Sequence, residues 1–263
     1  MTENDKIKTL VIPDVHGRDF WRKPVKDVLE NTNARVVFLG DYLDPYSYEF
    51  KHGFNFQENA IGVFKEIIDL KKQYPDRITL LLGNHDATYR FKDGTLICQC
   101  RTDGKNYNKI QSIFMDNKDL FCLADEETIE GKHFIFSHAG IHRGYVNEAF
   151  PEEYEKITDD NVVEFFNKKY REEDKKLIQS LGMYDNYRGW GGHICGSIVW
   201  ADVHSWFGRA YDGYGYGVFG HTQMEHGVGG IITDNFADLD SAEAFVITDK
   251  GEIKQHNTYN END

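Results

Sequence analysis

The sequence lacks an excess of basic residues, and this absence excludes one large class of function. It contains 30 Lys and Arg residues against 44 Asp and Glu residues, which gives a formal net charge of -14. Proteins that bind DNA or RNA generically carry basic surface, because they must neutralise phosphates. Long hydrophobic runs are also missing, since no apolar stretch approaches the roughly 18 residues of a membrane-spanning helix. We therefore expect neither generic nucleic-acid binding nor membrane insertion.

Cysteine is scarce as well. The four cysteines are Cys98, Cys100, Cys122 and Cys195, and they do not form paired CxxC clusters. This spacing indicates neither a zinc knuckle nor a disulfide framework. The first six residues contain no apolar signal core. We expect a cytoplasmic protein whose thiols are reduced.

Short apolar runs alternate with helical patterns in the first third of the chain. Runs typical of buried strands occur at residues 7–12, 36–39 and 78–82. Apolar side chains recur at the spacing of an amphipathic helix at residues 57–73, and a shorter helix is predicted at residues 20–30. This alternation implies right-handed crossovers and a sheet that is at least partly parallel.

The rest of the chain is less regular. Helices are predicted at residues 105–116 and 162–181, and short strands at residues 134–136 and 218–219. The tail, residues 244–255, predicts a β-hairpin with a glycine in its turn.

The chain shows no convincing domain linker. Its 263 residues can bury a full core as one domain. We therefore predict a single domain over residues 1–263, with a helical and loop cap around residues 150–195.

Five apolar runs each end in a short loop that carries Asp, His or Asn. These residues are Asp14 with His16, Asp41 with Asp44, Asn84 with His85 and Asp86, then His138, then His221. One such residue alone is usually a turn or a hydrogen-bonded structural residue. Ligands of open α/β sheets bind just beyond the carboxyl ends of the strands. Five loops of this kind in the same relative position therefore favour a shared site.

The residue types of this site indicate metal chemistry. Imidazole and carboxylate groups without thiolates suit Mn, Fe or Zn, of which we expect Mn to serve in vitro. The candidate groups are too many for one tetrahedral catalytic ion. They suit two divalent ions about 4 Å apart that share a carboxylate, a geometry that clamps both oxygens of a displacement at phosphorus. Our hypothesis is that Asp41 is the shared carboxylate.

The sequence resembles the calcineurin-like metallophosphoesterase superfamily in five motifs. The DxHG, GDxxD and GNHD patterns of that superfamily are matched by residues 14–17, 40–44 and 83–86. Its two late histidine motifs are matched by residues 137–140 and 220–221. The resemblance implies a four-layer α/β/β/α sandwich of two mixed β-sheets flanked by helices.

Within the superfamily, the resemblance is closest to the phosphoprotein phosphatases and the bacterial diadenosine tetraphosphate hydrolases. Gly17 directly follows His16, and the SHAG segment at residues 137–140 is similar to a motif of these enzymes. The VWAD segment at residues 199–202 resembles their Trp-Ser-Asp. The DSA segment at residues 240–242 resembles the Asp-Thr-Gly of bacterial members.

The resemblance also implies a role for each motif residue. The implied ligands are Asp14, His16 and Asp41 for the first metal, and Asp41, Asn84, His138 and His221 for the second. His85 would be the general acid for the leaving oxygen, oriented by Asp44. A neighbouring carboxylate favours the imidazolium near pH 7 and fixes the ring. The implied reaction is direct attack by a hydroxide that bridges the metals, without a covalent phosphoenzyme.

Two positions depart from patterns of the superfamily. Gln223 stands where many broader members have a second histidine, which the phosphoprotein phosphatases also lack, so it supports the closer resemblance; its amide oxygen is a further candidate ligand of the first metal. Pro45 stands where the phosphatases place an arginine that clamps phosphate, and proline cannot replace a bidentate guanidinium. Arg209 is our candidate for the clamp, and the further candidates are Arg90, Arg143 and Arg188.

Three functions are compatible with these residues. The first choice is hydrolysis of phosphomonoesters, with a phosphorylated protein or a small phosphoester as the partner. The second is hydrolysis of a dinucleoside polyphosphate or another small nucleotide, with Tyr211, Tyr214 and Tyr216 as base-stacking groups. The third is a non-catalytic binding module, which the presence of His85 and every metal-site residue disfavours.

Overall fold

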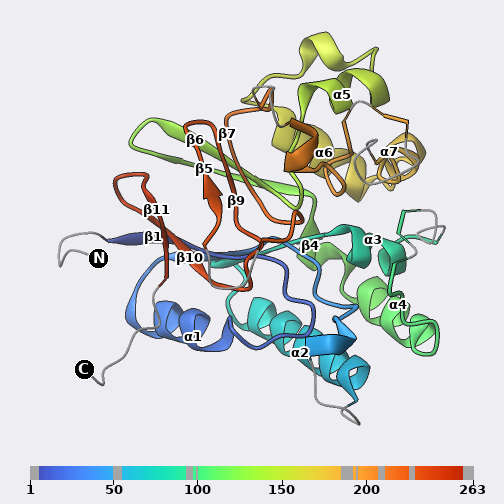
Figure 1. The fold of residues 1–263 in the computed structure, drawn as a ribbon, viewed down its shortest axis with the longest axis vertical. Helices are drawn as coiled ribbons and strands as arrows, with labels where there is room; N and C mark the ends of the chain where they lie inside the picture. The colour runs from blue at the N-terminus through green and yellow to red at the C-terminus, as the bar shows by residue number, and fades with distance from the viewer. Residues whose placement is uncertain are drawn as a thin grey trace.

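The chain folds into two β-sheets that face one another, with helices outside them (Figure 1). The structure is a computed structural model, and it describes residues 6–49, 55–92, 97–98, 100–184, 192–193, 195–206, 211–224 and 229–256. In these residues it contains seven α-helices and two mixed sheets. This is the α/β architecture that the sequence predicts.

The first sheet has six strands in the order β11-β10-β1-β2-β3-β4. The strands are β1 (Ile7–Ile12), β2 (Arg35–Phe38), β3 (Ile78–Leu81), β4 (Phe121–Cys122), β10 (Phe245–Thr248) and β11 (Ile253–Gln255). Strands β1 to β4 run parallel, and β10 and β11 are antiparallel to their neighbours. The tail forms the predicted hairpin, and Gly251 adopts a φ of 72° next to its turn.

The second sheet has five strands in the order β5-β6-β7-β9-β8. The strands are β5 (Ala124–Ile129), β6 (Lys132–Ser137), β7 (Tyr216–Phe219), β8 (Ile231–Ile232) and β9 (Phe236–Asp238). Here β6, β7 and β9 are parallel. Two strands of this sheet, β6 and β7, correspond to the short apolar runs expected from the sequence. The sequence did not predict β5, because its residues ADEETI are mostly polar and only its two ends are buried.

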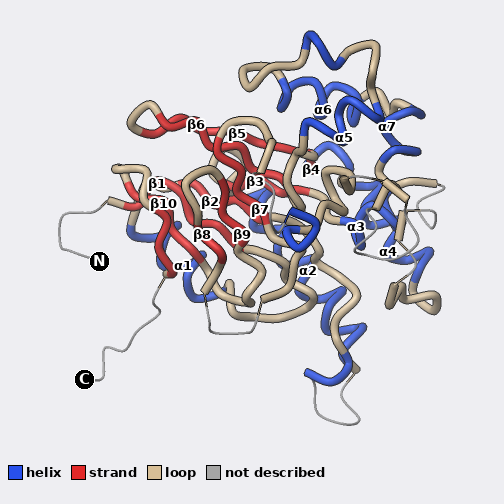
Figure 2. The backbone as a smooth tube through the Cα atoms, turned by 45° about the horizontal axis from the view of Figure 1, so that its top comes forward, coloured by secondary structure: helices blue, strands red, loops and turns tan. Residues whose placement is uncertain are grey.

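The helices pack on both sides of the strands. They are α1 (Arg22–Asn31), α2 (Phe56–Gln73), α3 (Asn84–Arg90), α4 (Tyr107–Asp116), α5 (Arg143–Ala149), α6 (Val162–Arg171) and α7 (Lys175–Ser180). Short 3₁₀ helices span Ser47–Glu49, Lys118–Leu120, Tyr154–Lys156 and Val203–Trp206. In Figures 1 and 2, α1 and α2 lie below the strands, and α3 to α7 lie on one side of them. No helix of the described residues has the length and apolar character to span a membrane.

One predicted helix was wrong. The sequence predicts a continuous helix over residues 162–181, whereas the structure has α6 and α7 with a break between them. Glu173 adopts a left-handed φ of 49°, which interrupts the helix. Asp174 then starts α7, because its side chain accepts the backbone N–H of Leu177 at 2.8 Å. Both helices contribute side chains to the main core cluster, among them Phe166 and Leu177.

The core follows the two-residue period of the strands. In β1, Leu10 and Ile12 belong to the cluster that includes the buried faces of α1 and α2. Val11, which points the other way, belongs to a second cluster together with Phe134 and Val218 of the second sheet. Successive side chains of a strand point to opposite faces, so one strand serves two layers. This alternation holds the helices and both sheets together.

The parallel strands position the polar loops. The strands β1, β2, β3, β6 and β7 each run directly into one of the five motifs identified in the sequence. Because parallel strands in one sheet end at the same edge, and the two sheets face each other, the loops converge.

Helix α4 provides a test of the core. Phe114 is fully buried and its ring lies 4.6 Å from that of Phe64 and 5.2 Å from that of Phe121. Met115 follows it on the same helix and is 46% exposed. We expect Phe114→Ala to lower the free energy of unfolding by about 3–5 kcal/mol, because the truncation removes buried apolar contacts and leaves a cavity. Met115→Ala should change it by only about 0.5 kcal/mol. Urea unfolding of both variants measures the difference, and equal losses would contradict this packing.

Candidate metal centre

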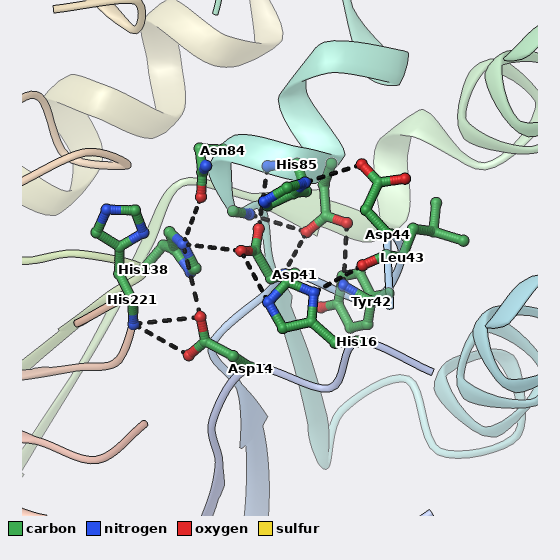
Figure 3. Close-up of polar contacts among 12 residues, drawn as sticks. Asp14, His16, Asp41, Tyr42, Leu43, Asp44, Asn84, His85, His138 and His221 are labelled. Atoms are coloured by element: carbon green, nitrogen blue, oxygen red, sulfur yellow. Dashed lines mark hydrogen bonds and ion pairs between the residues drawn. The ribbon is translucent and has the colours of Figure 1, made fainter. Parts of the chain in front are cut away.

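Every loop that follows one of these strands sends buried polar side chains toward a single point (Figure 3). Asp14 and His16 follow β1, and Asp41 and Asp44 follow β2. The remaining residues are Asn84 and His85 at the start of α3, His138 after β6, and His221 after β7. The structure thus brings together all eight residues that the sequence predicts for the metal sites and the general acid. Their roles stay predictions.

Asp41 lies in the middle of the cluster. Its Oδ2 atom is 3.5 Å from Nε2 of His16 and 3.5 Å from Nε2 of His138. Two groups of side chains have ligand atoms within 4.8 Å of one another: Asp14, His16 and Asp41, and Asp41, His138 and His221. Asp41 belongs to both. Burial alone would raise the pKa of Asp41, but the neighbouring histidines outweigh it and lower the pKa to about 2.

Hydrogen bonds fix the two histidines nearest to Asp41. Nδ1 of His16 lies 2.7 Å from the carbonyl oxygen of Leu43, and Nδ1 of His138 lies 2.9 Å from that of Leu39. A carbonyl oxygen can only accept, so Nδ1 carries the hydrogen in both rings. When such a ring is neutral, its lone pair is on Nε2, which faces Asp41. Burial holds the pKa of His16 well below its usual value, which favours the neutral, metal-binding form.

The donor set fits cations. Nε2 of His138 lies 3.0 Å from Oδ1 of Asn84 and 3.9 Å from Oδ1 of Asp14. In the neutral form of His138, the form that binds a metal, all three atoms are acceptors. Acceptors that converge in a buried site need a cation or a proton between them. Nitrogen and carboxylate or amide oxygen ligands without thiolate suit Mn, Fe or Zn.

The backbone of these loops is in an uncommon conformation. His16, Asp41, Asp44 and His221 have φ values of 45°, 51°, 56° and 70°. Non-glycine residues in this left-handed region are strained by about 1–3 kcal/mol each, and such strain concentrates at functional sites.

Two glycines allow the carboxylates to approach the backbone. A Cβ atom at Gly83 would lie 2.0 Å from Oδ1 of Asp41, and a Cβ atom at Gly220 would lie 2.1 Å from Oδ2 of Asp14. Any side chain there would displace the carboxylate. Asp41 Oδ1 uses this space to accept the backbone N–H of His85 at 3.0 Å.

Asp86 holds two of the loops together. Its buried carboxylate accepts the backbone N–H groups of Asp41 at 2.6 Å, Tyr42 at 3.1 Å and Gly83 at 2.9 Å. It therefore links the loop after β2 to the start of α3. The sequence places Asp86 among the candidate polar groups, but its task as a backbone clamp depends on where the two loops meet in space.

His85 and Asp44 form the predicted pair. Nδ1 of His85 lies 2.8 Å from Oδ2 of Asp44, and both side chains are buried. Tyr89 donates its hydroxyl hydrogen to the other oxygen of Asp44. Burial lowers the pKa of His85, but the negative charges of Asp41 and Asp44 outweigh burial, so that its pKa is raised.

A cavity of about 290 Å³ opens over this cluster. Besides Asp14, His16, Asp41, Asn84, His85 and His221, its lining residues are Tyr46, Cys100, Arg101, Trp200 and Asp240. A space of this size accommodates a phosphoryl group and a few waters, whereas pockets for drug-sized ligands typically range from about 300 to 1,000 Å³.

Some expected binding residues lie elsewhere. Arg90 is bound to Tyr170 and Glu173, and Arg143 is bound to Asp159; neither lines the cavity. Arg188 and Arg209 lie outside the described residues. Neither Arg90 nor Arg143 is therefore placed to contact a phosphate in this cavity, and each guanidinium is held by another partner.

Four further expectations concern Gln223 and three tyrosines. Gln223 is exposed and does not line the cavity. Tyr211, Tyr214 and Tyr216 are buried and do not line it either. Their rings pack in the core clusters, which agrees with a packing role for these tyrosines.

Arg101 was not singled out from the sequence. It lines the cavity, and its Nη2 atom lies 3.0 Å from Nε2 of His85. The surrounding residues, QCRTDG, form no recognisable motif and follow no strand. Only the folded arrangement reveals that this arginine reaches the site.

The overall fold is similar to that of two solved phosphatases. A cold-active protein-tyrosine phosphatase of a psychrophilic Shewanella species is 15% identical, with a TM-score of 0.53 over 95% of this chain and 80% of that chain. A protein serine/threonine phosphatase from Saccharomyces cerevisiae, with similarity to human phosphatase PP5, is 14% identical, with a TM-score of 0.53 over 100% of this chain and 83% of that chain. At these identities the similarity shows the fold.

The sequence itself shows the family. Residues 7–225 match the family model of the calcineurin-like phosphoesterases. The match includes all five motifs, and the cluster around Asp41 provides the buried Asp and His groups that a metal-dependent family requires. The chain therefore belongs to the calcineurin-like phosphoesterase family.

Proposed function

We propose that the protein is a phosphomonoesterase that depends on two divalent cations and acts on a phosphorylated protein or a small phosphoester. The observation that carries the proposal is that Asp41 belongs to both metal-competent groups, while His85, which is bound to Asp44, lines the same cavity. One group suits a first cation and the other a second. Bound cations would supply an activated water and positive charge at the phosphoryl group.

In this proposal the remaining side chains of the site hold and move a proton. His85 donates the proton on Nε2 to the leaving oxygen, and Asp44 holds the ring through Nδ1. Asp41 and Asp44 raise the pKa of His85, which favours the imidazolium form that this role needs. Tyr89 fixes Asp44 from behind, which keeps the carboxylate oriented toward His85.

A phosphomonoester is our first choice over a dinucleoside polyphosphate. The cavity of about 290 Å³ has room for a phosphoryl group, and its aromatic lining among the described residues is Tyr46 and Trp200. Base-stacking aromatics are not available from Tyr211, Tyr214 or Tyr216, which are buried. Both solved relatives are described as protein phosphatases, which agrees with this choice.

A substrate panel tests the proposed function. We expect chelator-treated protein to be inactive, and added Mn²⁺ to restore hydrolysis of p-nitrophenyl phosphate and of phosphopeptides. Diadenosine tetraphosphate should have a kcat/KM at least tenfold lower than that of the best phosphopeptide. A preference for the dinucleotide would reverse the substrate choice, and the absence of any phosphoesterase activity with Mn²⁺, Fe²⁺ or Zn²⁺ would refute the proposal.

Asp41 provides a test of the shared ligand. We expect Asp41→Asn to reduce bound Mn²⁺ from two ions per chain to one or fewer, because a neutral amide is a poor bridge between two cations. Elemental analysis after dialysis against Mn²⁺ measures the stoichiometry. Asp27→Asn is the matched control, because Asp27 lies on α1 and pairs with Lys23 on the exposed surface. Two tightly held ions in Asp41→Asn would rule out the shared carboxylate.

His85 provides a test of the proton donor. We expect His85→Asn to retain two Mn²⁺ ions and to lower kcat by about 10²–10⁴. The loss should be larger for phenyl phosphate than for p-nitrophenyl phosphate, because nitrophenol is the more acidic leaving group and needs less proton transfer. An equal loss for the two esters would show that His85 does not protonate the leaving oxygen.

A further inference from the structure

Arg101 is the arginine that lines the cavity among the described residues, and its surroundings suggest a ligand. Its Cζ atom lies 3.5 Å from the ring centroid of Tyr46, so the guanidinium contacts the face of the ring. Its Nη2 atom is 3.0 Å from Nε2 of His85. Its backbone has a left-handed φ of 55°, like four residues of the candidate metal centre.

The other arginines that the structure describes have committed partners. Six of them form ion pairs with carboxylates: Arg18, Arg22, Arg35, Arg90, Arg143 and Arg171. The seventh, Arg77, donates hydrogen bonds to backbone carbonyls. Arg101 is the described arginine that contacts neither a carboxylate nor a backbone carbonyl. Its Nε atom is buried without a hydrogen-bond partner. A buried guanidinium donor of this kind fits an anion that enters the cavity.

The loop of Arg101 is tied to the His85–Asp44 pair. The backbone N–H of Asp103 donates to the hydroxyl oxygen of Tyr89 at 2.7 Å, and Tyr89 donates to Asp44. Arg101 is thereby held at a fixed place relative to His85. A guanidinium 3.0 Å from Nε2 is also within reach of a phosphoryl group whose leaving oxygen is bound at that nitrogen.

The present partner of Arg101 is one that a phosphate can replace. An arginine only donates hydrogen bonds, so Nε2 of His85 accepts in this contact, and the contact must break before Nε2 can carry the proton of the general acid. A neutral ring nitrogen offers one acceptor, whereas a phosphoryl group offers two charged oxygens that match the guanidinium fork. Tyr46 can keep the plane of the guanidinium fixed while the donors turn to the new acceptor.

We propose that Arg101 binds two oxygens of the substrate phosphoryl group while it stacks on Tyr46. The inference rests on the proposed function. It assigns the phosphate contact to a loop after α3, whereas Pro45 occupies the position where the sequence resemblance places an arginine. Tyr46, the residue after Pro45, supplies the supporting ring instead.

Two substitutions and one control test Arg101. Arg101→Gln removes the charge, Arg101→Lys keeps the charge without the fork, and Arg171→Gln changes an exposed arginine of α6. The first readout is the Kd of inorganic phosphate for the Mn²⁺-loaded protein, measured by calorimetry. The second is the KM and kcat for p-nitrophenyl phosphate, and the third is bound Mn²⁺.

We expect Arg101→Gln to raise the phosphate Kd and the KM at least tenfold, because a hydrogen-bonded charge is lost. Arg101→Lys should raise them about threefold to tenfold. Bound Mn²⁺ should stay at the wild-type level, and Arg171→Gln should match the wild type in all three readouts. If Arg101→Gln does not fold, the phosphate Kd and the KM of Arg101→Lys test the inference.

A phosphate Kd within twofold of the wild type in either variant, or loss of Mn²⁺ in Arg101→Gln, would overturn the inference. A failure of the proposed function gives a different result. The wild type would then hydrolyse no phosphoester, but the phosphate Kd values of the wild type and the Arg101 variants would still show whether Arg101 binds phosphate.

Discussion

The structure depends on the convergence of buried acceptors around one carboxylate. Oδ2 of Asp41 lies 3.5 Å from two imidazole nitrogens, and Oδ1 accepts a backbone N–H. A buried carboxylate is costly unless charge and hydrogen bonds compensate for it. The surrounding histidines provide part of that compensation, which is why the pKa of Asp41 is low. Cations would provide the rest, so metal binding and the stability of these loops are coupled.

A second set of contacts, outside this cluster, stabilises the strained backbone of the loops. Asp86 binds three backbone N–H groups from two loops, and the carbonyl groups of Leu39 and Leu43 fix two histidine rings. These contacts compensate for left-handed backbone at Asp41 and its neighbours. Because the geometry is set before any ligand arrives, the side chains need little rearrangement to bind one.

The sequence predicted the elements whose pattern is local. The apolar runs of β1, β2 and β3 and the amphipathic face of α2 were recognisable, and so were the polar residues after each strand. The break between α6 and α7 at Glu173 was not recognisable, because the charged residues around it are compatible with a continuous helix. Strand β5 was missed because a polar strand shows no clear alternation, and it is stabilised by pairing with β6. Arg101 was missed because its position depends on the fold of a loop that carries no motif.

The charge of the site is consistent with the proposed cations and arginine. Asp14, Asp41 and Asp240 line the cavity, and the chain as a whole carries a formal net charge of -14. A phosphoryl dianion would be repelled from such a surface until cations offset the carboxylates. The histidine nitrogens that face Asp41 would hold the cations together with the carboxylates. Arg101 lies next to His85 and Tyr46 in the same cavity, where it can contact oxygens of a bound phosphoryl group. Positive charge from the cations and from Arg101 would hold the phosphoryl group next to His85, which is the proximity that proton transfer to the leaving oxygen requires.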